Sequence, residues 1–144
     1  MSQANIDLTK RWFEEVWNQG REEAIDRLYA SDAVAYGLDG GDGVRGPEGF
    51  KPFHRQLCGA FARRRFTVAD AMASGDMVAL RWTAEMDHTG DHLGKPATGK
   101  TVHLTGMVFC RIRDGQIHDS WNNWDMLGFL SAIGVIDLST VIER

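Results

Sequence analysis

The spacing of hydrophobic residues divides the chain into a helical first part and a strand-forming second part. Up to about residue 61, apolar residues return every three or four positions, which predicts three helices. Gly20 ends the first helix, Ser31-Asp32 follows the second, and Gly46-Pro47-Glu48 begins the third, because proline suits the first turn of a helix. The three apolar faces are Ile6, Phe13, Val16 and Trp17; Ala24, Ile25, Leu28 and Tyr29; and Phe50, Phe53, Leu57, Ala60 and Phe61.

Beyond Arg65 the period changes to that of strands. Alternation predicts strands at 66–73, 77–88, 101–113 and 116–124, and a short strand at 33–36 precedes the third helix. Ser74-Gly75-Asp76 and Asp114-Gly115 are typical of the tight turns that join antiparallel strands. Helices followed by a meander of strands predict a single α+β domain, 1–144, in which three N-terminal helices cover one face of a curved sheet.

Composition narrows the classes of partner. The chain has 43% hydrophobic and 25% charged residues and a formal net charge of -4, as expected for a globular protein without a nucleic-acid partner. The one basic run, Arg63-Arg64-Arg65, is interpreted as a solvated helix end. We find no basic leader and no apolar run near the roughly 20 residues of a membrane span, so we expect a cytoplasmic protein with no membrane contact.

The strand at 101–113 is apolar on both faces. Val108 and Cys110 lie on one side, and Met107 and Phe109 lie on the other. A solvated second face would not favour this pattern, so a homodimer joined through the sheets is expected. Cys58 and Cys110 are too far apart for a paired metal or redox motif, and buried free thiols are the favoured interpretation.

Several short motifs, in order, resemble one known family over nearly the whole chain. They are Trp17-Asn18-Gln19-Gly20, Gly46-Pro47-Glu48-Gly49-Phe50, His88-Thr89-Gly90, Gly94 to Lys100, Gly106, Arg111 to Ile117, and Trp124 to Gly128. This pattern is similar to the SnoaL-like polyketide cyclases. The resemblance implies a cone-shaped α+β barrel of the nuclear transport factor two kind, usually dimeric, with a ligand pocket between sheet and helices. It also implies cofactor-free chemistry on a hydrophobic, polyketide-like carbonyl compound, by intramolecular aldol cyclisation or isomerisation.

Three positions depart from what the resemblance implies. The acid/base aspartate of the family falls at Asn122, its helper histidine at Val108, and a polar residue of the first strand at Ala35. An amide cannot act as a base. The NH2 group of Asn122 could still donate to a carbonyl or enolate oxygen.

The remaining polar chemistry is placed by strand alternation. If Asn122 faces the pocket, as the resemblance implies, then His118, Ser120 and Trp124 share its face, and Ile117, Asp119 and Trp121 point outward. Met86 marks the inner face of the preceding strand and His88 continues it. We therefore predict catalytic roles for His88, Asp125, Asn122 and His118, and ligand contacts for Trp12, Tyr36, Phe53, Trp82, Met86, Ser120 and Trp124.

Each candidate also has a structural interpretation. His88 could simply hydrogen-bond nearby backbone, and Asp125, just before a terminal helix, is more often an N-cap. His118 and Ser120 could be satisfied polar residues of the sheet, and the large aromatic residues could be core. The functional hypotheses therefore include an acid/base enzyme, a non-catalytic small-molecule binding domain, and a hydroxylase-type relative.

Two clusters resemble metal sites only in part. Asp87-His88-x-x-Asp91-His92 carries suitable side chains, but Gly90 interrupts any helical presentation of the two histidines. Asp39-Gly40-Gly41-Asp42-Gly43 lacks the closing glutamate of a calcium loop and is interpreted as a turn or lid at the pocket mouth. We expect neither a metal nor a cofactor.

Overall fold

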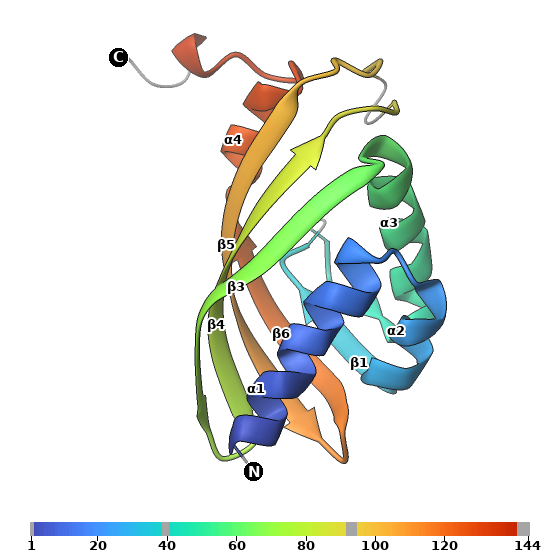
Figure 1. Cartoon of the computed structure of the whole chain (residues 1–144), viewed down its shortest axis with the longest axis vertical. Helices are drawn as coiled ribbons and strands as arrows, with labels where there is room; N and C mark the ends of the chain where they lie inside the picture. Colours follow the sequence, from blue (N-terminus) through green and yellow to red (C-terminus); the bar gives the residue numbers. More distant parts are fainter. Residues whose placement is uncertain (1, 39–40, 92–94, 141–144) are drawn as a thin grey trace.

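The computed structural model describes residues 2–38, 41–91 and 95–140 of the chain (Figure 1). Most of the first part is helical, and the second part is dominated by four long strands. In chain order the elements are α1 Ser2–Arg11, the π-helix η1 Trp12–Asn18, α2 Glu22–Leu28, β1 Tyr29–Tyr36, β2 Val44–Arg45, α3 Gly46–Ala60, β3 Arg63–Ser74, β4 Met77–Asp87, β5 Thr101–Arg113, β6 Gln116–Trp124, α4 Met126–Ala132 and the short 3-10 helix η2 Leu138–Thr140.

The six strands form one mixed sheet in the order β2-β1-β6-β5-β4-β3. β1 runs parallel to β6, and every other neighbouring pair is antiparallel. The sheet curves around α1, α2 and α3, which lie on one of its faces (Figure 1). The predicted α+β class is confirmed, and the sheet is curved but open at its edges.

Side chains of β5 alternate strictly between the two faces of the sheet. The even-numbered residues from Val102 to Ile112 are buried, whereas the odd-numbered ones from Thr101 to Phe109 are exposed. We call the buried side, which the helices cover, the inner face and the opposite side the outer face. The period of two therefore sorts the residues of one strand between two environments.

The tight turns match their sequence signals. Asp114 and Gly115 join β5 to β6 with φ angles of 51° and 72°, both in the left-handed region that a two-residue hairpin turn of this kind requires. The predicted bounds of β5 and β6 are confirmed, and β3 and β4 differ from prediction by a few residues.

Two boundary predictions were wrong, and with the first of them the predicted break at Ser31-Asp32, which lies inside β1. Tyr29 was assigned to the second helix but begins β1, where its hydroxyl donates to the Val44 carbonyl at 3.0 Å. Arg63-Arg64-Arg65 was interpreted as a helix end but begins β3. Arg63 pairs there with Asp87 and Glu85 of β4, at 2.6 and 2.7 Å. In both cases cross-strand partners far away in sequence outweigh the local pattern.

No helix within the described ranges is both long and apolar enough to cross a membrane. Nor do the described residues contain a group of three or more His, Cys, Asp or Glu side chains that could hold a metal ion. His92 of the Asp87-His88-x-x-Asp91-His92 cluster lies outside the described residues, and so do Asp39-Gly40 of the segment interpreted as a turn or lid.

Candidate functional site

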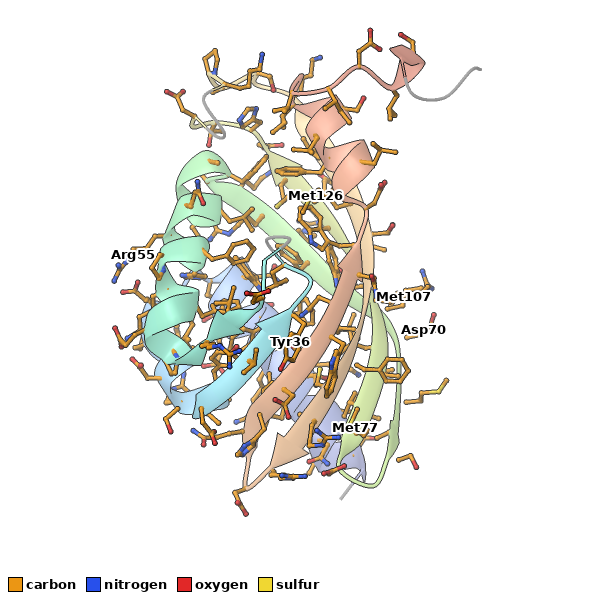
Figure 2. The ribbon with its side chains drawn as sticks, turned by 180° about the vertical axis from the view of Figure 1, so that it is seen from behind. Tyr36, Arg55, Asp70, Met77, Met107 and Met126 are labelled. Carbon is orange, nitrogen blue, oxygen red and sulfur yellow. The ribbon has the colours of Figure 1, made fainter. Side chains whose placement is uncertain are left out.

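A cavity of about 100 Å³ lies between the inner face of the sheet and the helices. Figure 2 shows side chains of both layers filling the space around it. Pockets for drug-sized molecules measure about 300–1,000 Å³, whereas an apolar cavity of about 150 Å³ can hold benzene. The cavity in its present shape is smaller than both, so a guest of a single ring is at its upper limit.

The cavity wall is almost entirely apolar, and none of its described lining residues is charged. Six of the seven predicted ligand-contact residues belong to it, namely Trp12, Phe53, Trp82, Met86, Ser120 and Trp124, and Asn122 lies among them. Ala35 and Val108, at the two positions where the sequence resemblance implied polar residues, also line it. The three departures from the expected pattern therefore meet at a single cavity.

The helical wall is shaped by η1, a π-helix that presents Trp12, Phe13 and Trp17 to the cavity. Asn18 attaches this helix to the edge strand β3. Its Nδ2 donates to the Phe66 carbonyl at 3.0 Å, and its Oδ1 accepts from the Phe66 N–H at 2.6 Å. The amide thereby imitates one rung of a sheet ladder, which gives the Trp17-Asn18 motif a positioning role.

His54 of α3 supports the same helix from inside. Its Nε2 donates to the Val16 carbonyl at 2.6 Å, and the side chain is almost fully buried. Burial, helped by the nearby Arg64 guanidinium, lowers the pKa of His54 even though the bond to Val16 opposes the shift. His54 is therefore held neutral, and its N–H group hydrogen-bonds a backbone carbonyl of the π-helix.

Gly106 allows two tryptophans to share the sheet wall. It pairs with Trp82 of β4 on one side and with Trp124 of β6 on the other. A Cβ atom at position 106 would lie 2.3 Å from Cζ2 of Trp82, which is inside any normal contact. Residue 106 is therefore glycine because the Trp82 ring occupies the space that a side chain would need.

β6 supplies a line of polar groups to the otherwise apolar wall. Ser120, Asn122 and Trp124, called here the polar row, alternate along the strand and all line the cavity. Asn122 Nδ2 donates to the Tyr36 carbonyl at 2.9 Å and to Ser120 Oγ at 3.0 Å. The buried Nε1 of Trp124 has no hydrogen-bond partner among the described residues.

The predicted faces of Ile117 and His118 were wrong. Arg111 pairs with Asp119 and Ile112 pairs with Ile117, so His118 is an extra residue in the ladder, a β-bulge. The bulge turns Ile117 into the cavity, whereas His118 lies outside it with Nδ1 3.8 Å from Asp32 Oδ1. One inserted residue therefore removes His118 from the face shared by the polar row.

His88 is fully buried but is not a described lining residue of the cavity. Its Nδ1 accepts from the Thr98 backbone N–H at 3.2 Å and lies 3.0 Å from Thr98 Oγ1. Because a backbone N–H can only donate, Nδ1 carries no proton and the neutral ring carries its hydrogen on Nε2. Nε2 has no partner in the described part of the chain, so His88 holds a buried donor rather than a free base.

Asp125 is an exposed N-cap of α4. Its Oδ1 accepts from the Gly128 N–H at 2.9 Å, as the capping interpretation predicted. A Cβ atom on Gly128 would lie 2.3 Å from Asp125 Oδ2, which explains the glycine of the Asp125-x-x-Gly128 pattern. Asp125 is absent from the described cavity wall.

Tyr36 was predicted to contact the ligand, but its ring lies outside the cavity lining. The ring stacks on Trp121, with centroids 6.0 Å apart and an interplanar angle of 17°. Only the Tyr36 backbone carbonyl serves the site, through its bond from Asn122.

The thiols are unsuited to nucleophilic chemistry. Burial raises the pKa of Cys110, which lines the cavity, to about 12, so its thiol stays protonated near neutral pH. Burial also raises the pKa of the half-buried Cys58. Neither cysteine is in a disulfide, as expected.

Sequence reasoning did not assign some wall residues to the site. Phe13, Trp17 and Tyr29 were identified only as apolar helix positions, because in a hollow fold the core and the pocket wall are the same residues. Thr9 carried no signal. Its hydroxyl donates to the Ile6 carbonyl at 2.6 Å, which satisfies it within its own helix.

Comparisons with known proteins agree on one family. The profile of the SnoaL-like polyketide cyclases matches residues 7–133. No curated protein sequence matches the chain significantly.

Solved structures resemble the whole fold. A proposed SnoaL-like polyketide cyclase from Jannaschia sp. CCS1 has a TM-score of 0.84 and 22% identity over 95% of this chain and 96% of its own. IdmH, a proposed polyketide cyclase from Streptomyces antibioticus, has a TM-score of 0.77 and 29% identity, covering 90% and 98%. AclR, a proposed hydroxylase from Streptomyces galilaeus, has a TM-score of 0.79 and 25% identity, covering 92% and 82%.

Proposed function

Because the chain belongs to the SnoaL-like polyketide cyclase family, we propose that it binds a neutral, ring-sized carbonyl compound in its cavity without a cofactor. The observation that carries this proposal is the polar row of Ser120, Asn122 and Trp124 on one wall of an uncharged, apolar cavity. Apolar walls bury the hydrocarbon of a ligand, and a few convergent polar groups orient it.

Binding is favoured over acid/base catalysis because the cavity offers no base among its described lining residues. A general base must lie within hydrogen-bond reach of the proton that it removes. His88, His118 and Asp125 lie outside the lining. Within the lining, burial raises the pKa of both Cys110 and Tyr29, and the Asn122 amide cannot act as a base near neutral pH.

The binding proposal can be tested with two substitutions of adjacent residues on β5. Acetophenone is titrated into the protein while tryptophan fluorescence is followed, since Trp12, Trp82 and Trp124 line the cavity. Val108→Phe, which fills the cavity, is expected to weaken binding at least about tenfold. Met107→Phe, whose side chain lies on the outer face, is the matched control and should bind as the wild type does. Equal binding by the two variants, or no saturable binding by the wild type, would contradict the proposal.

A second candidate function is cyclisation of a polyketide-like compound. The family match and the likeness to IdmH favour it, and the position of the family aspartate is occupied by an amide that lines the cavity. Asn122→Asp would place a carboxyl group beside the Tyr36 carbonyl, which disfavours the charged form and so makes a stronger base. We expect this variant to raise turnover of a β-keto ester. A folded variant without any gain would count against cyclisation at this position.

We also propose that the chain forms a homodimer through the outer face. Four large apolar side chains are exposed there, Met72 at 71%, Met107 at 62%, Phe109 at 57% and Trp121 at 38%. Figure 2 shows Met107 and Asp70 pointing away from the helices on this side of the sheet. Asp70 and Arg81 lie in the same groove and pair at 2.6 Å, so the surface carries both charges and can meet a second copy of itself.

The dimer is tested by light scattering after gel filtration. Phe109→Glu is expected to give monomers, because a charge would be buried at the centre of the interface. Leu127→Glu is the control, since Leu127 is 41% exposed but belongs to α4 rather than to the sheet. A wild type that is monomeric at about 100 µM would overturn the proposal.

A further inference from the structure

The polar row contains hydrogen-bonding capacity that the protein itself leaves unused. Both N–H groups of the Asn122 amide are engaged, one by the Tyr36 carbonyl and one by Ser120 Oγ. The amide cannot be turned around, because a backbone carbonyl only accepts and must face the nitrogen. No hydrogen bond of the described residues uses the oxygen Oδ1, and Oδ1 is not among their fully buried unpartnered atoms, so this acceptor is open to a guest.

The two neighbours of Asn122 along the row, Ser120 and Trp124, offer donors where Asn122 offers an acceptor. Ser120 Oγ already accepts from Asn122, so its hydroxyl hydrogen is available to donate, and the side chain is buried against the cavity. Trp124 Nε1 is buried, unpartnered among the described residues and can only donate. The α-carbons of alternate residues in a strand are about 7 Å apart. The row therefore presents a donor, an acceptor and a donor in order along one wall.

The backbone beside Asn122 keeps this arrangement in place. Gly37 follows Tyr36 with a φ angle of 83°, and a Cβ atom there would lie 2.1 Å from the Asn122 carbonyl oxygen. The chain can thus approach β6 closely only because residue 37 is glycine. This approach holds the Tyr36 carbonyl within 2.9 Å of the amide nitrogen.

We propose that Asn122 is a specificity-determining residue that selects ligands in which a hydroxyl group and a carbonyl group stand apart on one ring, as in a 3-hydroxyaryl ketone. The ligand hydroxyl donates to Asn122 Oδ1, and its carbonyl accepts from Ser120 Oγ or Trp124 Nε1. This assignment rests on the proposed function of the cavity as a ligand site. It also reverses the sequence-based expectation that the Asn122 NH2 group donates to an enolate, because both of its hydrogens are already engaged.

Ligands that offer only acceptors are disfavoured by the same geometry. A diketone, a carboxylate or an enolate would direct a lone pair at Oδ1, and a bound ketone without the hydroxyl would cover Oδ1 without pairing it. Discrimination of this kind is strongest where a site is built to bond a hydroxyl that the competitor lacks.

Calorimetric titration with three matched monocyclic compounds tests the assignment. 3-Hydroxyacetophenone has the hydroxyl and the carbonyl, 3-methoxyacetophenone has acceptors only, and acetophenone has the carbonyl alone. The wild type is expected to bind the hydroxy-ketone about tenfold more tightly than either of the others, as one buried hydrogen bond requires. Asn122→Leu should remove that preference, whereas Ser120→Ala should weaken all three compounds alike.

The possible failures are distinguishable. Equal affinity of the wild type for all three compounds would overturn the role of Asn122 and leave the cavity as a ligand site. A preference that persists in a folded Asn122→Leu variant would do the same. If none of the three compounds bound, both this assignment and the proposed function would be overturned.

A measurement on the wild type needs no folded variant. In nuclear magnetic resonance spectra, the side-chain N–H signals of Asn122 should remain protected from hydrogen exchange when 3-hydroxyacetophenone is bound. Loss of that protection would show that the NH2 group has left the Tyr36 carbonyl and Ser120 Oγ, so that nothing holds Oδ1 toward the ligand, and it would overturn the assignment of Oδ1 as the acceptor of the ligand hydroxyl.

Discussion

The two faces of the sheet carry similar side chains under different conditions. On β5, Leu104 and Val108 face inward and are buried beneath the helices, whereas Met107 and Phe109 face outward and are exposed. Hydrophobicity alone does not separate these pairs. What separates them is the layer of α1, η1, α2 and α3 that covers one side of the sheet (Figure 1). The inner face can therefore build a cavity, whereas the outer face keeps its apolar side chains exposed.

The largest predicted difference between the faces concerns core packing. Leu104→Ala should lower the free energy of unfolding by about 2–4 kcal/mol, because it deletes buried methyl groups on the inner face. Met107→Ala, three residues later on the outer face, should change it by less than about 0.5 kcal/mol. Urea unfolding of both variants measures the difference at a concentration where the wild type is monomeric. Equal losses would mean that the outer face is packed as tightly as the inner one.

Gly106 offers a smaller and more local test of the inner face. Gly106→Ala should lower the free energy of unfolding by about 1–3 kcal/mol, because the new methyl group would meet the Trp82 ring. Gly59→Ala is the control, since a Cβ atom there meets nothing within 4 Å and the residue lies inside α3. We expect a stabilisation of about 0.5–1 kcal/mol from the control by helix propensity. Thermal unfolding followed by circular dichroism distinguishes the two signs.

The smallest effects depend on pH and fall in different windows for the two sides of the sheet. His54, under the helices, has a pKa lowered from 6.5, so the unfolded chain binds the proton more readily. Its contribution to stability is complete above about pH 6.5 and is lost as the pH falls below that value. Unfolding at pH 7.5 and pH 5.5 should show this loss, and His54→Gln should reduce it.

On the outer side, the half-buried Asp87 behaves differently. Its pKa is lowered from 3.8 to about 2, first by Arg63 and then by Thr101. Any stability from this group is present above pH 3.8 and is lost as the pH falls toward 2. Asp87→Asn should therefore leave the pH 5.5 to 7.5 comparison unchanged, and a change there would contradict the assignment of that window to His54.

Much of the fold could be predicted from the sequence, because alternation and turn residues are local signals. β5 and β6 were predicted with the correct bounds, and of the two roles predicted for Asp125, catalytic or capping, the capping role is the one that the structure confirms. Membership of the cavity wall was also predictable for Trp82, Met86 and Trp124, whose side chains lie on the inner face.

The failures have a common cause. Strict alternation could not place Ile117 and His118, because the ladder with β5 contains an extra residue that only the pairing reveals. Tyr36 was predicted to contact the ligand, but its ring stacks on Trp121 at the outer face. His88 continued the inner face of β4 in sequence, yet its Nδ1 is taken by Thr98, ten residues later.

The sequence by itself determined which segments form helices and strands and which residues can be buried, since these depend on periods of a few residues. The tertiary structure decided what the polar residues do. Asn122 became an acceptor because the Tyr36 carbonyl, 86 residues earlier, took its N–H group. The role of a side chain with both donor and acceptor atoms depends on which of these atoms the folded chain already bonds. Strand pairing places that partner.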